Sequence, residues 1–377
     1  MNITEYVKAN TDELYKILKE LCLIPAPSHH EEKRAEYCKA WFDKNGLEGA
    51  YIDEALNVVF PYQAEGSDRL AVFEAHTDTV FPDTEPMPYV DDGEKIYCPG
   101  VGDDTASVAV LMLTAKYFVE NKIQTDGVLF VCNSCEEGLG NLKGTRFIFE
   151  SFKGRVEKFI SFDSSRFNYS ATRCVGSHRY EVEVLTEGGH SWSKFGNTNA
   201  IAELSKIVNE IYSIELPKKE GKKVTYNVGE ISGGTSVNTI AQSARMLCEY
   251  RSDDLELLAY MKGEFERIFE EAKNEKVTVK ATLVGDRPCA ADFDRSKQEA
   301  LMKIAADVIL QTTGEEMNFG SSSTDCNIPL SLGIPAITVG VYIGNGSHTR
   351  EEYIVKSSLV TGFEIGIKVL VKCAEIR

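Results

Sequence analysis

Residues Leu70 to Pro82 read LAVFEAHTDTVFP, an apolar run that breaks off into His76-Thr77-Asp78 and a turn closed by Pro82. A short apolar run bounded by turn residues predicts a buried strand. Side chains two apart on a strand share a face, so His76 and Asp78 would emerge side by side where the strand ends. Ligands usually bind at the ends of strands in an open α/β sheet. Taken alone, however, this tripeptide fits a surface histidine beside a solvated aspartate better.

Two further apolar stretches are predicted to be strands that end in acidic side chains. Residues 128–132 run into Glu136-Glu137, and residues 158–162 end at Asp163. Apolar strands separated by helical segments predict a mostly parallel sheet covered by helices, whose strand ends gather at one edge. Glu136 and Glu137 are adjacent on extended backbone, so we expect them to point opposite ways and to have different functions.

A third acidic pair precedes a predicted buried helix. Residues 106–119 are apolar nearly all round, and Asp103 and Asp104 stand just before them. Free N–H groups and the helix dipole favour carboxylates at this end of a helix. The two aspartates therefore either cap the helix or join the acidic edge of the sheet.

Length, charge and cysteine content limit the class of protein. A chain of 377 residues exceeds one ordinary core, so two domains are expected. The net charge of −17 would repel nucleic acid and anionic membranes, which excludes both as partners. Ten scattered cysteines and the lack of a signal peptide or apolar span predict a cytoplasmic protein. Cys132 and Cys135 form one Cys-x-x-Cys, but without a second pair we expect two thiols near a strand end.

Residues 175–287 differ in pattern from their surroundings. Their strand-helix-strand-strand-helix-strand order predicts a small α+β, ferredoxin-like domain with an antiparallel sheet. Residues 288–377 return to α/β, with a Gly/Ser-rich loop expected at 320–323. The small domain would therefore be inserted into a discontinuous large domain made of residues 1–174 and 288–377.

Three of the six histidines have settings typical of functional sites. His76 and His348 lie at or just after apolar strands, and His190 lies in a glycine-rich turn. The other three, which are His29, His30 and His178, are expected at the surface. Two imidazoles with several carboxylates suit zinc, with cobalt or manganese possible. Two metal ions that share a carboxylate can polarise a carbonyl and activate a water, and a further carboxylate is then needed as the base.

The motifs occur in the order found in a known family. They are His76-Thr77-Asp78-Thr79-Val80 with Pro82, Gly100-Val101-Gly102-Asp103-Asp104, Glu136-Glu137-Gly138, Asp163, Gly189-His190-Ser191 before Asn199-Ala200-Ile201, Gly233-Gly234 before Asn238, and Ser347-His348-Thr349. In this order the chain resembles the cocatalytic dizinc metallopeptidases that include peptidase T, carnosinase, aminoacylase and the glutamate carboxypeptidases. The likeness covers nearly the whole chain and is nearest to peptidase T-like proteins.

The resemblance implies a set of metal ligands. His76 and Asp163 would hold one zinc ion, Glu137 and His348 the other, and Asp103 would bridge the two. It also implies that Asp78 orients His76 and that Glu136 is the general base. The large domain would be the zinc-hydrolase catalytic domain.

The resemblance also implies roles for the inserted domain, which would be a lid and the interface of a homodimer. His190 would stabilise the tetrahedral oxyanion, often from the partner subunit. Asn238 and Arg251 would hold the substrate's carboxylate or carbonyl, and an ordinary salt bridge is an equal alternative for Arg251.

Two positions bear on the substrate. Many relatives carry lysine where this chain has Thr105, and Asp163 is typical of aminopeptidase-like members, whereas deacylases and carboxypeptidases tend to carry glutamate there. The chain is therefore predicted to be an aminopeptidase or di/tripeptidase. An N-acyl-amino-acid deacylase or carboxypeptidase is the alternative. A non-catalytic binding protein on the same scaffold would lack a ligand or the base, and here all are present.

Overall fold

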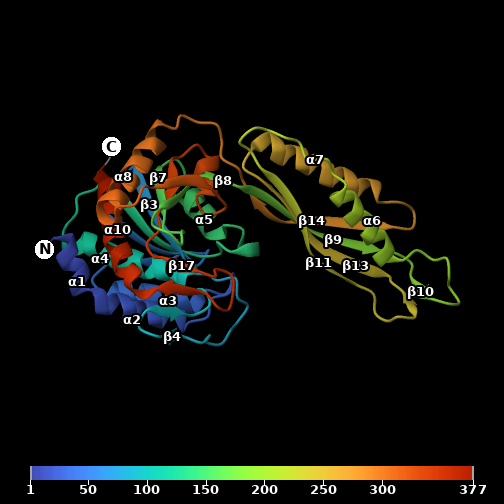
Figure 1. Cartoon of the computed structure of the whole chain (residues 1–377), viewed down its shortest axis with the longest axis horizontal. Helices are drawn as coiled ribbons and strands as arrows, with labels where there is room; N and C mark the ends of the chain where they lie inside the picture. The colour runs from blue at the N-terminus through green and yellow to red at the C-terminus, as the bar shows by residue number, and fades with distance from the viewer. Residues whose placement is uncertain (1, 376–377) are drawn as a thin grey trace. The chain divides into compact units, whose positions relative to one another are not determined.

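A computed structural model describes residues 2–375 of the chain. The chain forms two compact units, one made of Met1–Cys174 with Asp292–Arg377 and the other of Val175–Ala291 (Figure 1). Along residues 2–375, no helix combines the length and the hydropathy needed to cross a membrane.

A six-stranded sheet forms the centre of the first unit. Its order is β1-β2-β6-β3-β7-β16. The strands are β1 (Tyr51–Ile52), β2 (Val58–Tyr62), β6 (Val128–Asn133), β3 (Leu70–His76), β7 (Val156–Ser161) and β16 (Ala336–Thr338). The β6-β3-β7-β16 part is parallel, and β2 and β1 add an antiparallel edge. The predicted mostly parallel α/β sheet is therefore confirmed.

Helices bury the sheet of this unit on both faces. They are α1 (Ile3–Ala9), α2 (Thr11–Cys22), α3 (Glu32–Lys44), α4 (Ser107–Glu120), α5 (Lys143–Ser151), α8 (Ser296–Thr313), α9 (Asn327–Ser331) and α10 (Lys356–Glu375). On one face, Phe73 of β3 packs edge-on against Phe118 of α4; on the other, Phe149 of α5 packs against Phe159 of β7. All seven residues of β3 are consequently buried, which explains the apolar run Leu70–Phe73 with which it begins.

Smaller sheets flank the main one. One has the order β17-β18-β5-β4, made of β17 (Gly344–Asn345), β18 (Tyr353–Val355), β5 (Lys95–Tyr97) and β4 (Val90–Asp91). The loop predicted at 320–323 is wrong for most of its length, because β15 (Asn318–Ser322) pairs in parallel with β8 (Tyr169–Cys174). The Tyr169 side chain lies where a Cβ on Gly320 would stand, so this glycine permits a close approach and does not mark a turn.

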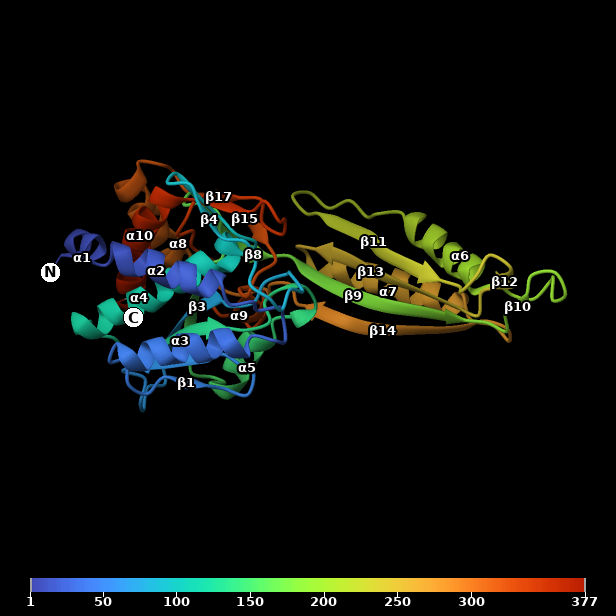
Figure 2. The same ribbon diagram turned by 90° about the horizontal axis from the view of Figure 1, so that it is seen from below.

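The second unit has the predicted α+β order. Its elements are β9 (Gly176–Leu185), α6 (Ala200–Tyr212), β11 (Val224–Gly233), β13 (Ser243–Ser252), α7 (Leu255–Glu271) and β14 (Thr278–Arg287). The strands form an antiparallel sheet in the order β11-β13-β9-β14, and Figure 2 shows them side by side. Asn199 and Asp254 cap the two helices, each accepting two backbone N–H groups. A short pair, β10 (Gly189–His190) with β12 (Thr239–Ile240), completes the unit.

Candidate metal centre

The parallel register of three strands brings the predicted ligands to one edge of the main sheet. His76 at the end of β3 lies opposite Asn133 at the end of β6, and Glu74 lies opposite Ser161 at the end of β7. The segments that follow these strands therefore leave the sheet together. They carry the acidic residues that the sequence placed there.

Asp103 is common to two groups of potential ligands. His76, Asp103 and Asp163 each offer a ligand atom within 4.8 Å of the others, and so do Asp103, Glu137 and His348. Asp103 Oδ1 lies 3.1 Å from His76 Nε2, and its Oδ2 lies 3.3 Å from His348 Nε2. His348 Nε2 is also 3.0 Å from Glu137 Oε1. The two oxygens of Asp103 thus face different histidines, which is the arrangement that a shared carboxylate requires.

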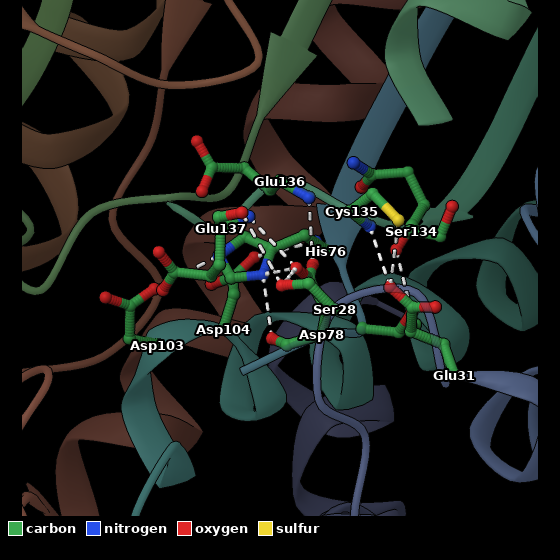
Figure 3. Close-up of polar contacts among 12 residues, drawn as sticks. Ser28, Glu31, His76, Asp78, Asp103, Asp104, Ser134, Cys135, Glu136 and Glu137 are labelled. Atoms are coloured by element: carbon green, nitrogen blue, oxygen red, sulfur yellow. Dashed lines mark hydrogen bonds and ion pairs between the residues drawn. The ribbon is translucent and has the colours of Figure 1, made fainter. Parts of the chain in front are cut away.

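Glu136 and Glu137 both reach the cluster. One atom of each lies within 4.8 Å of a ring nitrogen of His76 and of the other glutamate. The prediction that the two side chains point opposite ways is therefore wrong, and the segment is not the regular strand that it assumed, since Cys135, just before them, has a left-handed φ of +56°. Figure 3 shows both side chains above the His76–Asp78 segment.

The tautomer of His76 follows from its contacts. Its Nδ1 lies 3.1 Å from the backbone carbonyl oxygen of Asp78, and a carbonyl can only accept. Nδ1 therefore carries a proton, and Nε2 is the nitrogen that faces Asp103. A hydrogen bond from the ring nitrogen that does not bind the metal commonly orients a metal-ligating imidazole.

The charges of the cluster fit divalent cations. Burial and the neighbouring Asp103 raise the pKa of Asp163 well above its usual value. The same two causes raise the pKa of Glu137 to about 7. Hydrogen bonds to Asp103 and Glu137 raise the pKa of His348 to about 11. Without a cation, Asp163 and Glu137 therefore hold protons more readily than ordinary carboxyls, and a metal ion would bind the same oxygen atoms by displacing those protons. Imidazole nitrogen and carboxylate oxygen are ligands of zinc, cobalt and manganese.

Asp78 holds the loop that carries the two glutamates. Its fully buried carboxylate accepts the N–H of Glu136 and the N–H of Glu137, each at 2.9 Å, and the hydroxyl of Ser28 at 2.6 Å. Its Oδ1 is 3.4 Å from His76 Nδ1, farther than the backbone carbonyl. The side chain thus contacts the glutamate loop more closely than it contacts the histidine that it was predicted to orient.

Glu352 supports the candidate site but was not predicted from the sequence. Its buried carboxylate accepts three backbone N–H groups, from Gly100 at 2.6 Å and from Gly102 and Asp103 at 2.9 Å each. Burial raises the pKa of Glu352 to about 7. Glu352 lies in a charged run after His348 that carries no motif, so nothing in the sequence distinguished it from a solvated acid.

Arg34 was also missed, and it lies beside the unusual Thr105. Its buried guanidinium donates from Nη1 to the carbonyl of Thr77 at 2.7 Å and to Thr105 Oγ1 at 3.1 Å. Where many relatives carry a lysine, this chain therefore brings a buried cation from helix α3 to a threonine hydroxyl.

The remaining predicted site residues lie in the second unit. His190 and Asn238 are exposed and belong to neighbouring segments, since the N–H of Ser191 donates to the Asn238 carbonyl at 2.9 Å. Arg251 forms a two-point ion pair with Glu249, at 2.7 and 3.0 Å, as the salt-bridge alternative predicts.

The surface position predicted for His178 is wrong. This histidine is partly buried in the sheet of the second unit and is hydrogen-bonded to the Tyr250 hydroxyl.

Sequence comparison finds relatives among amide-bond hydrolases. The chain is 25% identical over 244 residues to a peptidase M20 domain-containing protein of Schizosaccharomyces pombe, an alignment that covers 62% of this chain and 59% of that protein. It thus spans about three fifths of that relative. It is 21% identical to the uncharacterized protein YqjE of Bacillus subtilis, over 97% of this chain and 100% of that one. An acetylornithine deacetylase of Myxococcus xanthus is 24% identical over 86% of this chain and 88% of its own length.

Solved structures share the fold over nearly the whole chain. A tripeptidase from Staphylococcus aureus matches with a TM-score of 0.73 and 22% identity, covering 96% of this chain and 99% of that one. The aminopeptidase PepT of Bacillus cereus matches with a TM-score of 0.71 and 20% identity, covering 97% and 99%. A dinuclear metal-binding peptidase of Bacillus subtilis matches with a TM-score of 0.66 and 15% identity, covering 98% and 99%. Because the model of peptidase family M20/M25/M40 matches residues 72–375, a span that includes both candidate ligand groups, the chain belongs to this family of metallopeptidases.

Proposed function

We propose that the protein is a dizinc hydrolase that cleaves the amide bond of di- and tripeptides with a free N-terminus. The observation that carries this proposal is the position of Asp103 between two ligand groups, one with His76 and Asp163 and one with Glu137 and His348. Zinc is proposed because imidazole and carboxylate donors suit it, and cobalt or manganese would fit the same ligands.

Each catalytic role is assigned to a residue of the cluster. When bound, the two metal ions polarise the scissile carbonyl and lower the pKa of the attacking water. Glu136 takes a proton from that water and returns it to the leaving amine. Asp78 keeps Glu136 and Glu137 in place through their backbone N–H groups. The carbonyl of Asp78 keeps the His76 ring oriented with Nε2 toward Asp103.

The preference for free peptides is supported by Asp163 and by the tripeptidase and the aminopeptidase PepT among the similar structures. The competing function is N-acyl-amino-acid deacylation or carboxypeptidase activity, supported by the acetylornithine deacetylase and by carboxypeptidase G2 among the relatives. The substrate is therefore a short peptide or an N-acyl amino acid.

His190 is proposed to stabilise the oxyanion. Its Nδ1 accepts the backbone N–H of Trp192 at 3.2 Å, so a neutral His190 carries its proton on Nε2 and presents a donor there. Asn238 is proposed to contact the substrate, and Arg251 only if its pair with Glu249 opens.

A homodimer formed through the second unit, acting in the cytoplasm, completes the proposal. The support is apolar surface on this unit, where Trp192, Phe195 and Val237 are 87%, 90% and 102% exposed. The mass in solution tests it, and a fully active monomer would contradict a role for His190 in a partner's site.

The test of the function is hydrolysis of free dipeptides, free tripeptides and their N-acetylated forms by enzyme reconstituted with zinc. Cleavage of the free peptides alone supports the proposal, whereas a preference for acetylated substrates would favour the deacylase. Glu136→Gln should retain two metal ions and lose about 10²–10⁴-fold in kcat. Glu150→Gln, at an exposed glutamate of α5, is the control and should keep the wild-type rate. A near-normal rate in Glu136→Gln would overturn the assigned mechanism.

A further inference from the structure

Glu31 is a buried acid that belongs to neither ligand group. It stands immediately before α3 and has 0% of its surface exposed. Its Oε1 accepts the backbone N–H of His29 at 3.0 Å and the backbone N–H of Cys135 at 3.0 Å, and the Cys135 thiol lies 3.2 Å away (Figure 3). One carboxylate oxygen thus joins two segments that are more than a hundred residues apart in the sequence.

Both residues that donate to Glu31 have left-handed backbone conformations. The φ angle is +73° for His29 and +56° for Cys135. A residue other than glycine loses about 1–2 kcal/mol in this region, and such conformations persist where the surroundings hold them in place. A buried acceptor in reach of both N–H groups supplies that restraint.

The Cys135 N–H is the first of three successive N–H groups held by buried carboxylates. Glu31 accepts the first, and Asp78 accepts the next two, from Glu136 and Glu137. Ser28, which precedes His29, donates its hydroxyl to Asp78 at 2.6 Å. The segment before α3 and the segment after β6 are therefore tied together by both acids, and the direction of the Glu136 side chain depends on this framework.

We propose that Glu31 is a positioning residue for the reaction, which holds Glu136 in place through the backbone of Cys135. The proposal rests on the role assigned to Glu136 above. Among the described residues, Glu31 belongs to none of the groups that could hold a metal ion, so its role would be exerted through Cys135. A base displaced by about 1 Å is expected to lower the rate by up to about 100-fold while the substrate still binds.

The experiment compares Glu31→Ala and Glu31→Gln, using whichever substrate the wild-type enzyme cleaves. Alanine removes the acceptor, so kcat should fall by about 10–100-fold, with KM changed less than about threefold and two metal ions retained per chain. Glutamine keeps an oxygen for the two N–H groups and should restore kcat to within about threefold of wild type. Glu32→Ala, one residue along on the exposed side of α3, is the matched control and should keep the wild-type rate.

Further variants keep the test decisive. Cys135→Ala removes the thiol but keeps the backbone N–H, so its kcat should stay near wild type if the N–H contact matters. Should Glu31→Ala fail to fold, Glu31→Asp replaces it, because the shorter side chain cannot reach both N–H groups, and the same loss of kcat is expected. An unchanged kcat in Glu31→Ala, or in Glu31→Asp where that variant replaces it, would overturn the proposal. Equal losses of kcat in Glu31→Ala and Glu31→Gln would overturn it as well. Inactivity of the wild-type enzyme on every amide substrate would instead overturn the proposed function.

Discussion

Replacing Glu352 by glutamine should weaken metal binding without touching a ligand. Glu352 Oε1 accepts the N–H groups of Gly102 and Asp103, and its Oε2 accepts that of Gly100. Glutamine has one oxygen, which can serve two of the three donors. Its NH₂ group would then face the third N–H, so one buried donor loses its acceptor.

The size of the effect follows from that one lost acceptor. Above its pKa of about 7 the Glu352 carboxylate is charged, and a hydrogen bond to a charged group contributes about 1.5–3 kcal/mol, where 1.36 kcal/mol corresponds to a tenfold change in an equilibrium constant. In the metal-free variant, the segment Gly100–Asp103 can move so that the unpaired N–H group avoids the glutamine NH₂. Metal binding, however, requires Asp103 to return to its place between the two ligand groups. The loss should therefore appear as about 10–100-fold weaker metal binding, the range usual for groups that support metal ligands.

The assay is competition for zinc between the protein and a chromogenic chelator at constant pH. Glu352→Ala leaves all three N–H groups without an acceptor and should bind metal more weakly than Glu352→Gln. Glu351→Gln changes the exposed neighbouring residue and should match wild type. If Glu352→Gln binds zinc within about twofold of wild type, the loop does not depend on this carboxylate and the reasoning is refuted.

Three further predictions concern the metal, packing and pH. Removing metal with a chelator should abolish amide hydrolysis and lower the Tm, since the clustered carboxylates lose their counter-charge, and zinc should restore both; retained activity in metal-free protein would contradict this. Gly362→Ala places a Cβ 1.5 Å from the Val341 carbonyl oxygen and should reduce the free energy of unfolding by about 3 kcal/mol. In contrast, Gly263→Ala in α7 meets no atom within 4 Å and should raise the free energy of unfolding, measured by urea denaturation, by about 0.5–1 kcal/mol. Equal stabilities of the two variants would contradict both expectations. Burial acts to raise the pKa of Glu249, but hydrogen bonds from its two arginine partners lower it below the ordinary 4.5. The stability lost in Glu249→Gln should accordingly be largest at neutral pH, begin to shrink as pH falls below about 4.5, and vanish only below the lower pKa that Glu249 has in the folded state; a difference in Tm that is constant with pH would refute it.

The central strands of the first unit could be predicted from sequence because both faces are covered. Burial on both sides favours apolar runs, and each strand contains one: Leu70–Phe73 in β3, Val128–Cys132 in β6 and Phe159–Ile160 in β7. Strand β15 could not be found in this way, since Asn318–Ser322 is polar and its partner β8 lies far away in the sequence. Whether such a segment forms a strand depends on the partner strand with which it pairs, and a local sequence pattern carries no information about that partner.

The candidate ligands could be predicted because histidine and acidic residues occur in recognisable motifs at the ends of predicted strands. Glu31, Glu352 and Arg34 could not, because their importance lies in what they face. The chain has 58 acidic residues, and the sequence does not distinguish an acid that is buried and accepts backbone N–H groups from one that is solvated. The left-handed residue Cys135 just before Glu136 was equally hidden in the sequence, since no glycine marks the turn.

The residues proposed to bind metal and those that hold the surrounding loops are different acids. Asp103 faces His76 with one oxygen and His348 with the other, and the N–H groups around it are accepted by Glu352. The same division is found at Glu136, the proposed base, whose backbone N–H is accepted by Asp78 and whose neighbour Cys135 is held by Glu31. It follows that two classes of variant should be separable by measurement. Loss of a ligand should lower the number of metal ions bound per chain, whereas loss of an anchoring acid should leave that number at two in saturating zinc and change only affinity or kcat.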